Sequence, residues 1–304
     1  MPKSKALTSP KTGQRFTPQD QETFWSQSLN RLADLLEAGA ERQDRATLLD
    51  RVSKYLLVPL LLLTSAQCVS AQDLVELPRD LEVELALSAL PDELQDQAAV
   101  YVRDPDQGFV LHREGTNGWM TFVARTSVRF YAADWNYSYP SDMLIPQAHG
   151  ELGLQNHVRP YFDLERLRIA GTPPAEAKRV LRERFENGTY RAPARGGVSY
   201  MLAPIHRAYM APAESDEIFT VSFPHHMPYA PFVKPEELGP MDPYGRSGIL
   251  DHGGDDAGPH GYLYLMIQPD QVAEIQSKYA GLLGRLCDQH DAWCLPEAGD
   301  DERP

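Results

Sequence analysis

Short runs of alternating hydrophobic and polar residues dominate the middle of the chain. Three of them, Ala98–Arg103, Gly108–Arg113 and Gly118–Ala124, are rich in β-branched and aromatic residues and are separated by turn sequences, which is the pattern of neighbouring β-strands. The pair Asn117-Gly118 favours a tight hairpin turn because both residues tolerate positive φ. We therefore predict an antiparallel meander of three strands joined by two turns.

Further strands are predicted on either side of this meander. Apolar residues at every second position from Leu81 to Leu87 indicate a short strand. A proline followed by acidic residues at Pro91–Leu94 is typical of the first turn of a short helix. Later strands are expected at Gly197–Ala203, Ile218–Phe223 and Gly261–Gln268.

Two regions carry helical patterns. Leu164–Asn187 is interpreted as a helix, a turn and a second helix, which begins after Thr172-Pro173-Pro174 and ends at Asn187-Gly188. Pro269–Asp288 is predicted as one C-terminal helix. The predicted fold class is α+β: an antiparallel, aromatic-rich sheet flanked by a two-helix insert and a C-terminal helix.

The segment Ser222–Phe232, SFPHHMPYAPF, must be extended, because three prolines fix their own φ and restrict the residue before each of them. Missing N–H donors favour an edge strand or a strand-to-loop passage. Alternation then places His225, Met227 and Tyr229 on the apolar face, with His226 on the other face. A buried, hydrogen-bonded structural role for His225 is the competing interpretation.

Length and charge limit the classes of partner. A chain of 304 residues with 42% hydrophobic content supports one main domain. A formal charge of −14 and a pI of about 5.1 argue against nucleic acid as a partner, since no basic patch is present. The sequence holds no apolar run of the roughly 20 residues that a membrane helix needs.

The apolar run Tyr55–Leu63 is short, follows basic residues and precedes Val69-Ser70-Ala71, which has the small residues of a leader-peptidase site. We predict a signal peptide at 52–71 and a periplasmic or secreted protein; a buried core helix of a cytosolic protein is the alternative. The polar extension 1–51 would then precede the true start of translation. The domain is expected at 72–293, with a disordered tail at 294–304.

In an oxidising compartment Cys287 and Cys294 can close a loop of about eight residues, worth roughly 2.5 kcal/mol. Two free thiols beside the last helix are the alternative. No C-x-x-C occurs, which argues against a zinc ribbon or a thioredoxin-like role.

The glycine-rich loop 251–260 carries histidines and carboxylates, which are ligand types of zinc, iron and manganese. A divalent metal held by His225, His252, Asp255 and His260 is therefore one hypothesis, and a solvated turn is the alternative. The loop lacks the glutamate of a calcium loop. No other cofactor is indicated, since neither a nucleophile motif nor a phosphate loop is present.

Several stretches together resemble an uncharacterised family of secreted bacterial proteins. The resemblance rests on R-E-G-T-N-G at Arg113–Gly118, on the strand GGVSYMLAP at Gly196–Pro204, and on PHHMPYAP at Pro224–Pro231. It covers most of Leu87–Ile267 and implies a leader but no activity. His225 matches the histidine of the family's P-H-x-M motif.

The first function hypothesis is a secreted or periplasmic module that binds a small molecule, with a pocket lined by Glu114, Asn117, His225, Met227 and Tyr229. The second is a metal-assisted or general acid–base enzyme, in which His225 acts with the 251–260 loop. A structural envelope protein without a ligand is the third. The sequence carries no signal of oligomeric state.

Overall fold

The computed structural model describes residues 74–127, 138–209, 217–239, 249–251 and 258–296. The chain divides into two compact units, Met1–Ala66 and Gln67–Pro304, and all described residues belong to the second. The predicted extension 1–51, the predicted leader 52–71 and residues 297–304 of the predicted tail lie outside the described residues. So do two of the proposed metal ligands, His252 and Asp255.

The described chain has an α+β fold built on one large mixed sheet, whose strand order is β2-β1-β3-β4-β5-β8-β10-β9. Its neighbouring strands are antiparallel, except for β1 and β3, which are parallel. The strands are β1 (Ala99–Asp104), β2 (Gly108–Arg113), β3 (Met120–Ala124), β4 (Ile145–His149), β5 (Val198–Met201), β8 (His225–Pro228), β9 (Ile249–Asp251) and β10 (Leu263–Met266). A separate hairpin pairs β6 (His206–Tyr209) with β7 (Ile218–Val221).

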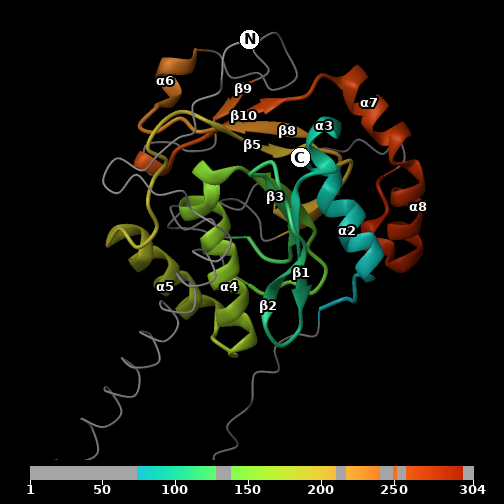
Figure 1. Cartoon of the computed structure of the whole chain (residues 1–304), viewed down its shortest axis with the longest axis horizontal. Helices are drawn as coiled ribbons and strands as arrows, with labels where there is room; N and C mark the ends of the chain where they lie inside the picture. The colour runs from blue at the N-terminus through green and yellow to red at the C-terminus, as the bar shows by residue number, and fades with distance from the viewer. Residues whose placement is uncertain (1–73, 128–137, 210–216, 240–248, 252–257, 297–304) are drawn as a thin grey trace, which may run out of the picture. The chain divides into compact units, whose positions relative to one another are not determined.

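Helices cover both faces of the sheet (Figure 1). On one face, here the α2 face, lie α2 (Arg79–Ser88), α3 (Asp92–Gln95), α7 (Pro269–Lys278), α8 (Ala280–Gln289) and the short turn η4 (Asp291–Trp293). On the other, the α4 face, lie η1 (Glu151–Gly153), η2 (Leu154–Val158), α4 (Arg159–Ile169) and α5 (Pro174–Glu186). The remaining short turns are α6 (Pro235–Leu238) and η3 (Gly258–His260).

Each face has its own hydrophobic core. On the α2 face, Leu85, Leu286 and Trp293 are fully buried against Val100 and Ala148 of the sheet. On the α4 face, Phe122 contacts Phe109 and Phe162 at ring-centroid distances of 5.0 and 5.3 Å. Alternation along the strands therefore divides the sheet side chains between two cores.

The strand predicted at Leu81–Leu87 is wrong, because this segment forms helix α2. Apolar residues at every second position also satisfy the helical spacing of four, so Leu81 and Leu85 lie on one buried face. Leucine, glutamate and alanine are strong helix formers, and the first turn carries Asp80 and Glu82 where the helix dipole favours acids.

The predicted three-strand meander is also wrong in its second half. The chain leaves β2 and crosses the start of β1, where the Thr116 and Asn117 amides donate to the Gln97 carbonyl. Strand β3 then runs parallel to β1 on its far side, through the pairs Ala99↔Met120 and Val100↔Thr121. We call Glu114–Gly118 the strap; it carries Gly118 at a φ of 77°, but it joins no hairpin.

The predicted edge position of the proline-rich segment is wrong, since β8 lies between β5 and β10. The strand is only four residues long, with Pro224 before it and Pro228 as its last residue. A proline at the end of so short a strand removes at most one ladder hydrogen bond, which explains why an interior position is tolerated.

The two-helix insert is confirmed by α4 and α5. The C-terminal helix is interrupted: α7 ends at Lys278, and Tyr279 has φ −100° and ψ 20° before α8 begins. The disulfide between Cys287 and Cys294 is present and joins α8 to the segment after η4. Trp293 is fully buried, and its indole Nε1 donates to the Asp142 carbonyl at 2.7 Å.

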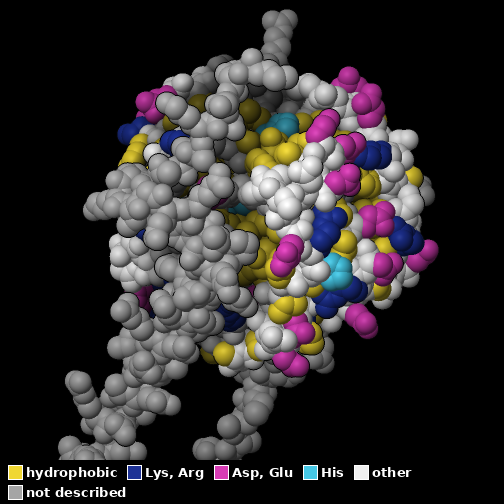
Figure 2. All heavy atoms as spheres, viewed as in Figure 1, with side chains coloured by type: hydrophobic (Ala, Val, Ile, Leu, Met, Phe, Trp, Pro, Cys, Tyr) yellow, Lys and Arg dark blue, Asp and Glu magenta, His cyan; other side chains and the backbone are white. Residues whose placement is uncertain are grey.

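The exposed sides of α2, α7 and α8 mix acidic and basic side chains (Figure 2). Arg285 of α8 pairs with Glu84 of α2, and Lys278 of α7 pairs with Asp92 of α3. Among the described residues, no helix combines the length and the apolar character that crossing a membrane requires.

Candidate functional site

The α4 face of the central strands carries a row of polar side chains. The register His149↔Ser199 between β4 and β5, and Ser199↔Met227 between β5 and β8, brings these residues side by side. Gln147 lies two positions before His149 on the same face. All four side chains are buried, and Ser199 and His149 are completely inaccessible.

A chain of hydrogen bonds links this row to Tyr229. The His149 ring is bonded to Gln147 Oε1 through Nε2 at 2.8 Å and to Ser199 Oγ through Nδ1 at 2.7 Å. Ser199 Oγ lies 2.5 Å from Tyr229 Oη. Burial raises the pKa of Tyr229 to about 12, so its hydroxyl keeps its proton. Gln147 Oε1 can only accept, so His149 carries its proton on Nε2, its Nδ1 accepts from Ser199, and the Ser199 oxygen accepts from Tyr229. The bonds therefore run in one direction, from Tyr229 through Ser199 and His149 to Gln147.

Two glycines make room for the Tyr229 ring. A Cβ atom on Gly197 would lie 2.8 Å from Leu152 Cδ1 and 3.2 Å from the Tyr229 ring, and a Cβ on Gly153 would overlap the Tyr229 hydroxyl. Both positions thus require a residue without a side chain for Tyr229 to reach Ser199.

His157 closes this cluster from the helical layer. Its ring stacks on His149 at 5.4 Å and on Tyr229 at 5.2 Å, nearly parallel to both. It lies on η2, a π-helical segment that precedes Pro160. Such segments are rare and occur often at functional sites.

The histidine rings of this cluster are neutral at pH 7. Burial, with a smaller contribution from neighbouring His260, lowers the pKa of His157 to about 3. Burial also takes the pKa of His149 well below its ordinary value, with a smaller effect from His157. Neutral imidazoles can accept hydrogen bonds as well as donate them.

Several buried polar atoms around the cluster lack a hydrogen-bond partner within the described part of the chain: Gln147 Nε2, His157 Nε2, and both amide atoms of Asn156. Gln147 is 1% and Asn156 2% exposed. Whichever way the Gln147 amide is turned, one of its two polar atoms has no partner. Buried polar groups are normally paired, so these atoms need partners from outside the described protein.

His225, Met227 and Tyr229 point to the α4 face as the alternation predicts, and all three are buried. His225 Nδ1 is bonded to the Phe223 carbonyl at 2.7 Å. The His225 ring lies 5.9 Å from the ring of His206, which is 3% exposed and is not among the residues that the sequence points to.

Glu114 and Asn117 are held apart from these residues, in the strap. The Asn117 side-chain amide donates to the Leu94 carbonyl of α3 and accepts from the Trp119 backbone amide, so both of its polar atoms hold the strap on the α2 side. Glu114 is exposed. The structure therefore brings together three of the five predicted ligand-binding residues.

Of the predicted metal ligands, His225 and His260 belong to the described chain. His260 lies in η3 and packs edge-on against Phe185 at 4.8 Å. No group of three or more histidines, cysteines or acids in the described residues is arranged to hold a metal ion.

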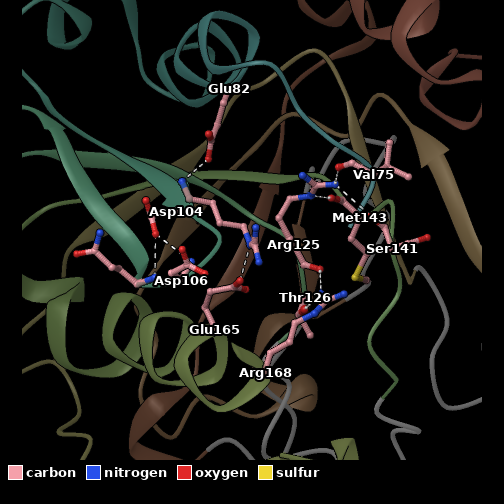
Figure 3. Close-up of polar contacts among 12 residues, drawn as sticks. Val75, Glu82, Asp104, Asp106, Arg125, Thr126, Ser141, Met143, Glu165 and Arg168 are labelled. Carbon is pink, nitrogen blue, oxygen red and sulfur yellow. Dashed lines mark hydrogen bonds and ion pairs between the residues drawn. The ribbon is translucent and has the colours of Figure 1, made fainter. Parts of the chain in front are cut away.

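A second buried polar cluster lies between α2, the sheet and α4 (Figure 3). Arg103 pairs with Glu165 at 2.5 Å through its side chain, and its backbone amide donates to Glu82 at 2.6 Å. Arg125 donates to the carbonyls of Met143 and Val75. Because these groups are paired with one another or with the backbone, we interpret the cluster as structural.

Some residues of the site are not predicted from the sequence, because the local pattern around each of them gives only a weak indication of its structure. Gln147 and His149 alternate on β4, but this strand contains Pro146 and closely follows Pro140, which does not favour a strand. His157 lies in a π-helical turn, for which the sequence has no periodic signature. Ser199 lies in a predicted strand, but its neighbour His149 is 50 residues away along the chain.

Comparison of this chain with protein-family models, with characterised proteins and with solved structures gave no match. The resemblance to secreted bacterial proteins, and the secreted location that it implies, therefore remain predictions.

Proposed function

We propose that this protein binds a small organic molecule on the α4 face of the sheet, beneath η2. The observation that carries this proposal is Asn156, which is 2% exposed and has two amide atoms without a partner among the described residues. Leaving a buried donor or acceptor unpaired costs about 1–3 kcal/mol. A ligand that supplies the missing partners would recover this energy.

The surroundings of Asn156 indicate the character of that ligand. Gln147 and His157 each present a further unpartnered polar atom, and the rings of His149 and Tyr161 both pack on Phe122 in the same cluster. Small-molecule sites usually combine aromatic walls with a few polar groups that fix orientation. The best fit is a flat, ring-containing molecule with amide-like donors and acceptors on its edge.

An enzyme is the second candidate, because Ser199, His149 and Gln147 have the order of a nucleophile, a base and an orienting residue. Against this, Ser199 is completely buried and its oxygen already accepts from Tyr229. Labelling by a fluorophosphonate at Ser199 in the native protein would favour catalysis. Absence of labelling, together with ligand binding, would favour the binding module.

The binding proposal is tested with the full-length protein and with benzamide, nicotinamide and uracil as probes. Binding is measured by saturation-transfer NMR and by thermal unfolding. The decisive variant is Asn156→Leu, which keeps the branched shape and the number of heavy atoms of the side chain and removes the polar atoms. The matched control is Gln155→Leu on the same turn, whose side chain instead accepts from Arg159.

We expect at least one probe to bind the protein and the Gln155→Leu control, but not Asn156→Leu. Because Asn156→Leu removes unpaired polar atoms, the unliganded variant should be at least as stable as the parent protein. If Asn156→Leu bound the probes as tightly as the parent protein, the amide would not hold the ligand and the proposal would be wrong. It would also be wrong if no probe bound.

A further inference from the structure

His225 presents a buried lone pair that no described residue uses. A carbonyl oxygen can only accept, so the bond to the Phe223 carbonyl places the proton of the neutral ring on Nδ1. Nε2 is then an acceptor, and it has no partner in the described part of the protein. Holding one ring nitrogen by a backbone carbonyl while the other stays unprotonated is how proteins prepare a metal-binding histidine.

His206 is also buried and has ring nitrogens without a hydrogen-bond partner among the described residues. It is 3% exposed, and neither of its ring nitrogens makes a hydrogen bond of ordinary geometry with a described residue. The Pro146 carbonyl lies close enough to favour a proton on one of them. The other nitrogen is left as a second buried lone pair.

The two rings are close enough to share one ion. Their centroids are 5.9 Å apart. Two imidazoles that each bind one ion at about 2 Å have ring centres about 6 Å apart or less.

Methionines occupy the positions on both sides of His225. In the sheet register Met201 of β5 and Met266 of β10 are its direct cross-strand neighbours, so all three side chains lie on the α4 face. Both methionines are buried, at 8% and 7% exposure. Direct cross-strand neighbours have Cβ atoms about 4.5–5.5 Å apart, within reach of a thioether.

We propose that His206, His225, Met201 and Met266 form a binding site for a soft metal ion, Cu(I). Thioether sulfur selects Cu(I) over zinc, magnesium or manganese, whereas imidazole is compatible with most transition metals. The described residues supply no third histidine, cysteine or acid at this place, which disfavours a harder ion. None of these four side chains is among the residues assigned above to the organic ligand, and Asn156 lies on η2 rather than on the sheet, so the variants at the two sites test the two proposals separately.

The test is an anaerobic titration of the full-length, tag-free protein with Cu(I) against bicinchoninate as a chromophoric competitor. One Cu(I) per chain is expected to bind. Met201→Leu and Met266→Leu should each weaken the affinity at least about tenfold, and His206→Leu should abolish stoichiometric binding. Methionine-to-leucine changes conserve volume and usually cost less than about 1.5 kcal/mol, so the variants should fold.

Met227→Leu is the matched control. Met227 is buried on the same strand and the same face as His225, but in the next row of the sheet. Its replacement should leave the Cu(I) affinity within about twofold of the parent. X-ray absorption of the parent complex, which needs no variant, should show both nitrogen and sulfur neighbours.

Three results would overturn the site. The first is no Cu(I) binding in competition with bicinchoninate. The second is stoichiometric binding that survives the double change Met201→Leu/Met266→Leu. The third is a metal environment without sulfur.

Discussion

Ser199 connects two side chains through a single oxygen. It donates to His149 Nδ1 and accepts from Tyr229 Oη, and it is completely buried. We predict that Ser199→Ala will lower the free energy of unfolding by about 2–4 kcal/mol, because it leaves both neighbours unpaired in the core. Tyr229→Phe should cost only about 1 kcal/mol, since Ser199 can still donate to His149. Urea denaturation measures both effects.

The matched control is Tyr200→Phe on the opposite face of β5, where the Tyr200 ring packs against Trp119 instead of the Ser199 cluster. Its effect should stay within about 0.5 kcal/mol. In the double variant Ser199→Ala/Tyr229→Phe the costs should be less than additive, since the second change removes a group that the first left unpaired. Strict additivity would show that the hydrogen-bond chain does not act as a unit.

The sequence predicts the orientation of individual side chains in one segment of the chain. Alternation puts His225, Met227 and Tyr229 on one face because the three prolines exclude a helix, and their burial follows from that geometry. The partners of these residues are not accessible in this way. His149, His157 and His206 reach them through contacts between distant segments, and no local pattern reports such contacts.

Among the elements, the strap depends on one glycine for close approach. A Cβ atom on Gly115 would overlap the backbone of Ala98 and Ala99 at the start of β1. We predict that Gly115→Ala will destabilise the protein by about 3 kcal/mol, because the clash is with backbone that cannot turn aside. Thermal or urea unfolding of the purified variant checks this.

Gly118→Ala is the comparison within the same strap. Gly118 has a φ of 77°, but a Cβ atom there would meet open space, so only the backbone conformation is penalised, at about 1–2 kcal/mol. If Gly118→Ala were the more damaging change, the turn conformation rather than the close approach would decide the stability of the strap.

At the same scale, prediction from the sequence succeeds where the signal is local. Helix α5 follows from its proline-rich start and from Asn187-Gly188 at its end, and β1, β2 and β10 follow from their apolar runs. Helix α2 is mistaken for a strand because apolar residues that recur at every second position also recur at every fourth position, which is the spacing of residues on one face of a helix. The parallel pairing of β1 with β3 escapes prediction because the strap is anchored by Gln97, which the turn sequence itself does not reveal.

For the whole molecule, buried neutral histidines make stability depend on pH. The folded-state pKa values of His149 and His157 lie below the ordinary 6.5, so the unfolded chain takes up protons first. The stability that these groups contribute is present above pH 6.5 and is lost as the pH falls toward their folded values. His157 alone accounts for about 2 kcal/mol between pH 7 and pH 5.

Glu82 opposes this trend. Burial raises its folded pKa to about 7, so its contribution is greatest below pH 4.5 and is lost as the pH rises through 7. Between pH 5 and pH 7, Glu82 changes the free energy of unfolding by about as much as one buried histidine does, in the opposite direction. Because at least two histidines act against one carboxyl group, we predict a net loss of at least about 2 kcal/mol at pH 5 relative to pH 7, measured by urea denaturation.

Two variants separate these contributions. His157→Phe keeps a ring between His149 and Tyr229 and should reduce the difference between pH 5 and pH 7 by about 2 kcal/mol. Glu82→Gln removes the opposing group and should increase the difference. Equal stability of the parent protein at the two pH values, with both variants unchanged, would contradict the assignment.

The place of Trp293 has a consequence for the order in which the molecule is made. Its buried ring, its bond to the Asp142 carbonyl and its contact with Arg125 fill the α2 face from a position near the end of the chain. During synthesis, earlier segments emerge first and begin to fold before this residue exists. The core on the α2 face can therefore be completed only after the segment that carries Trp293 has been synthesised, whereas the core on the α4 face can begin to assemble earlier.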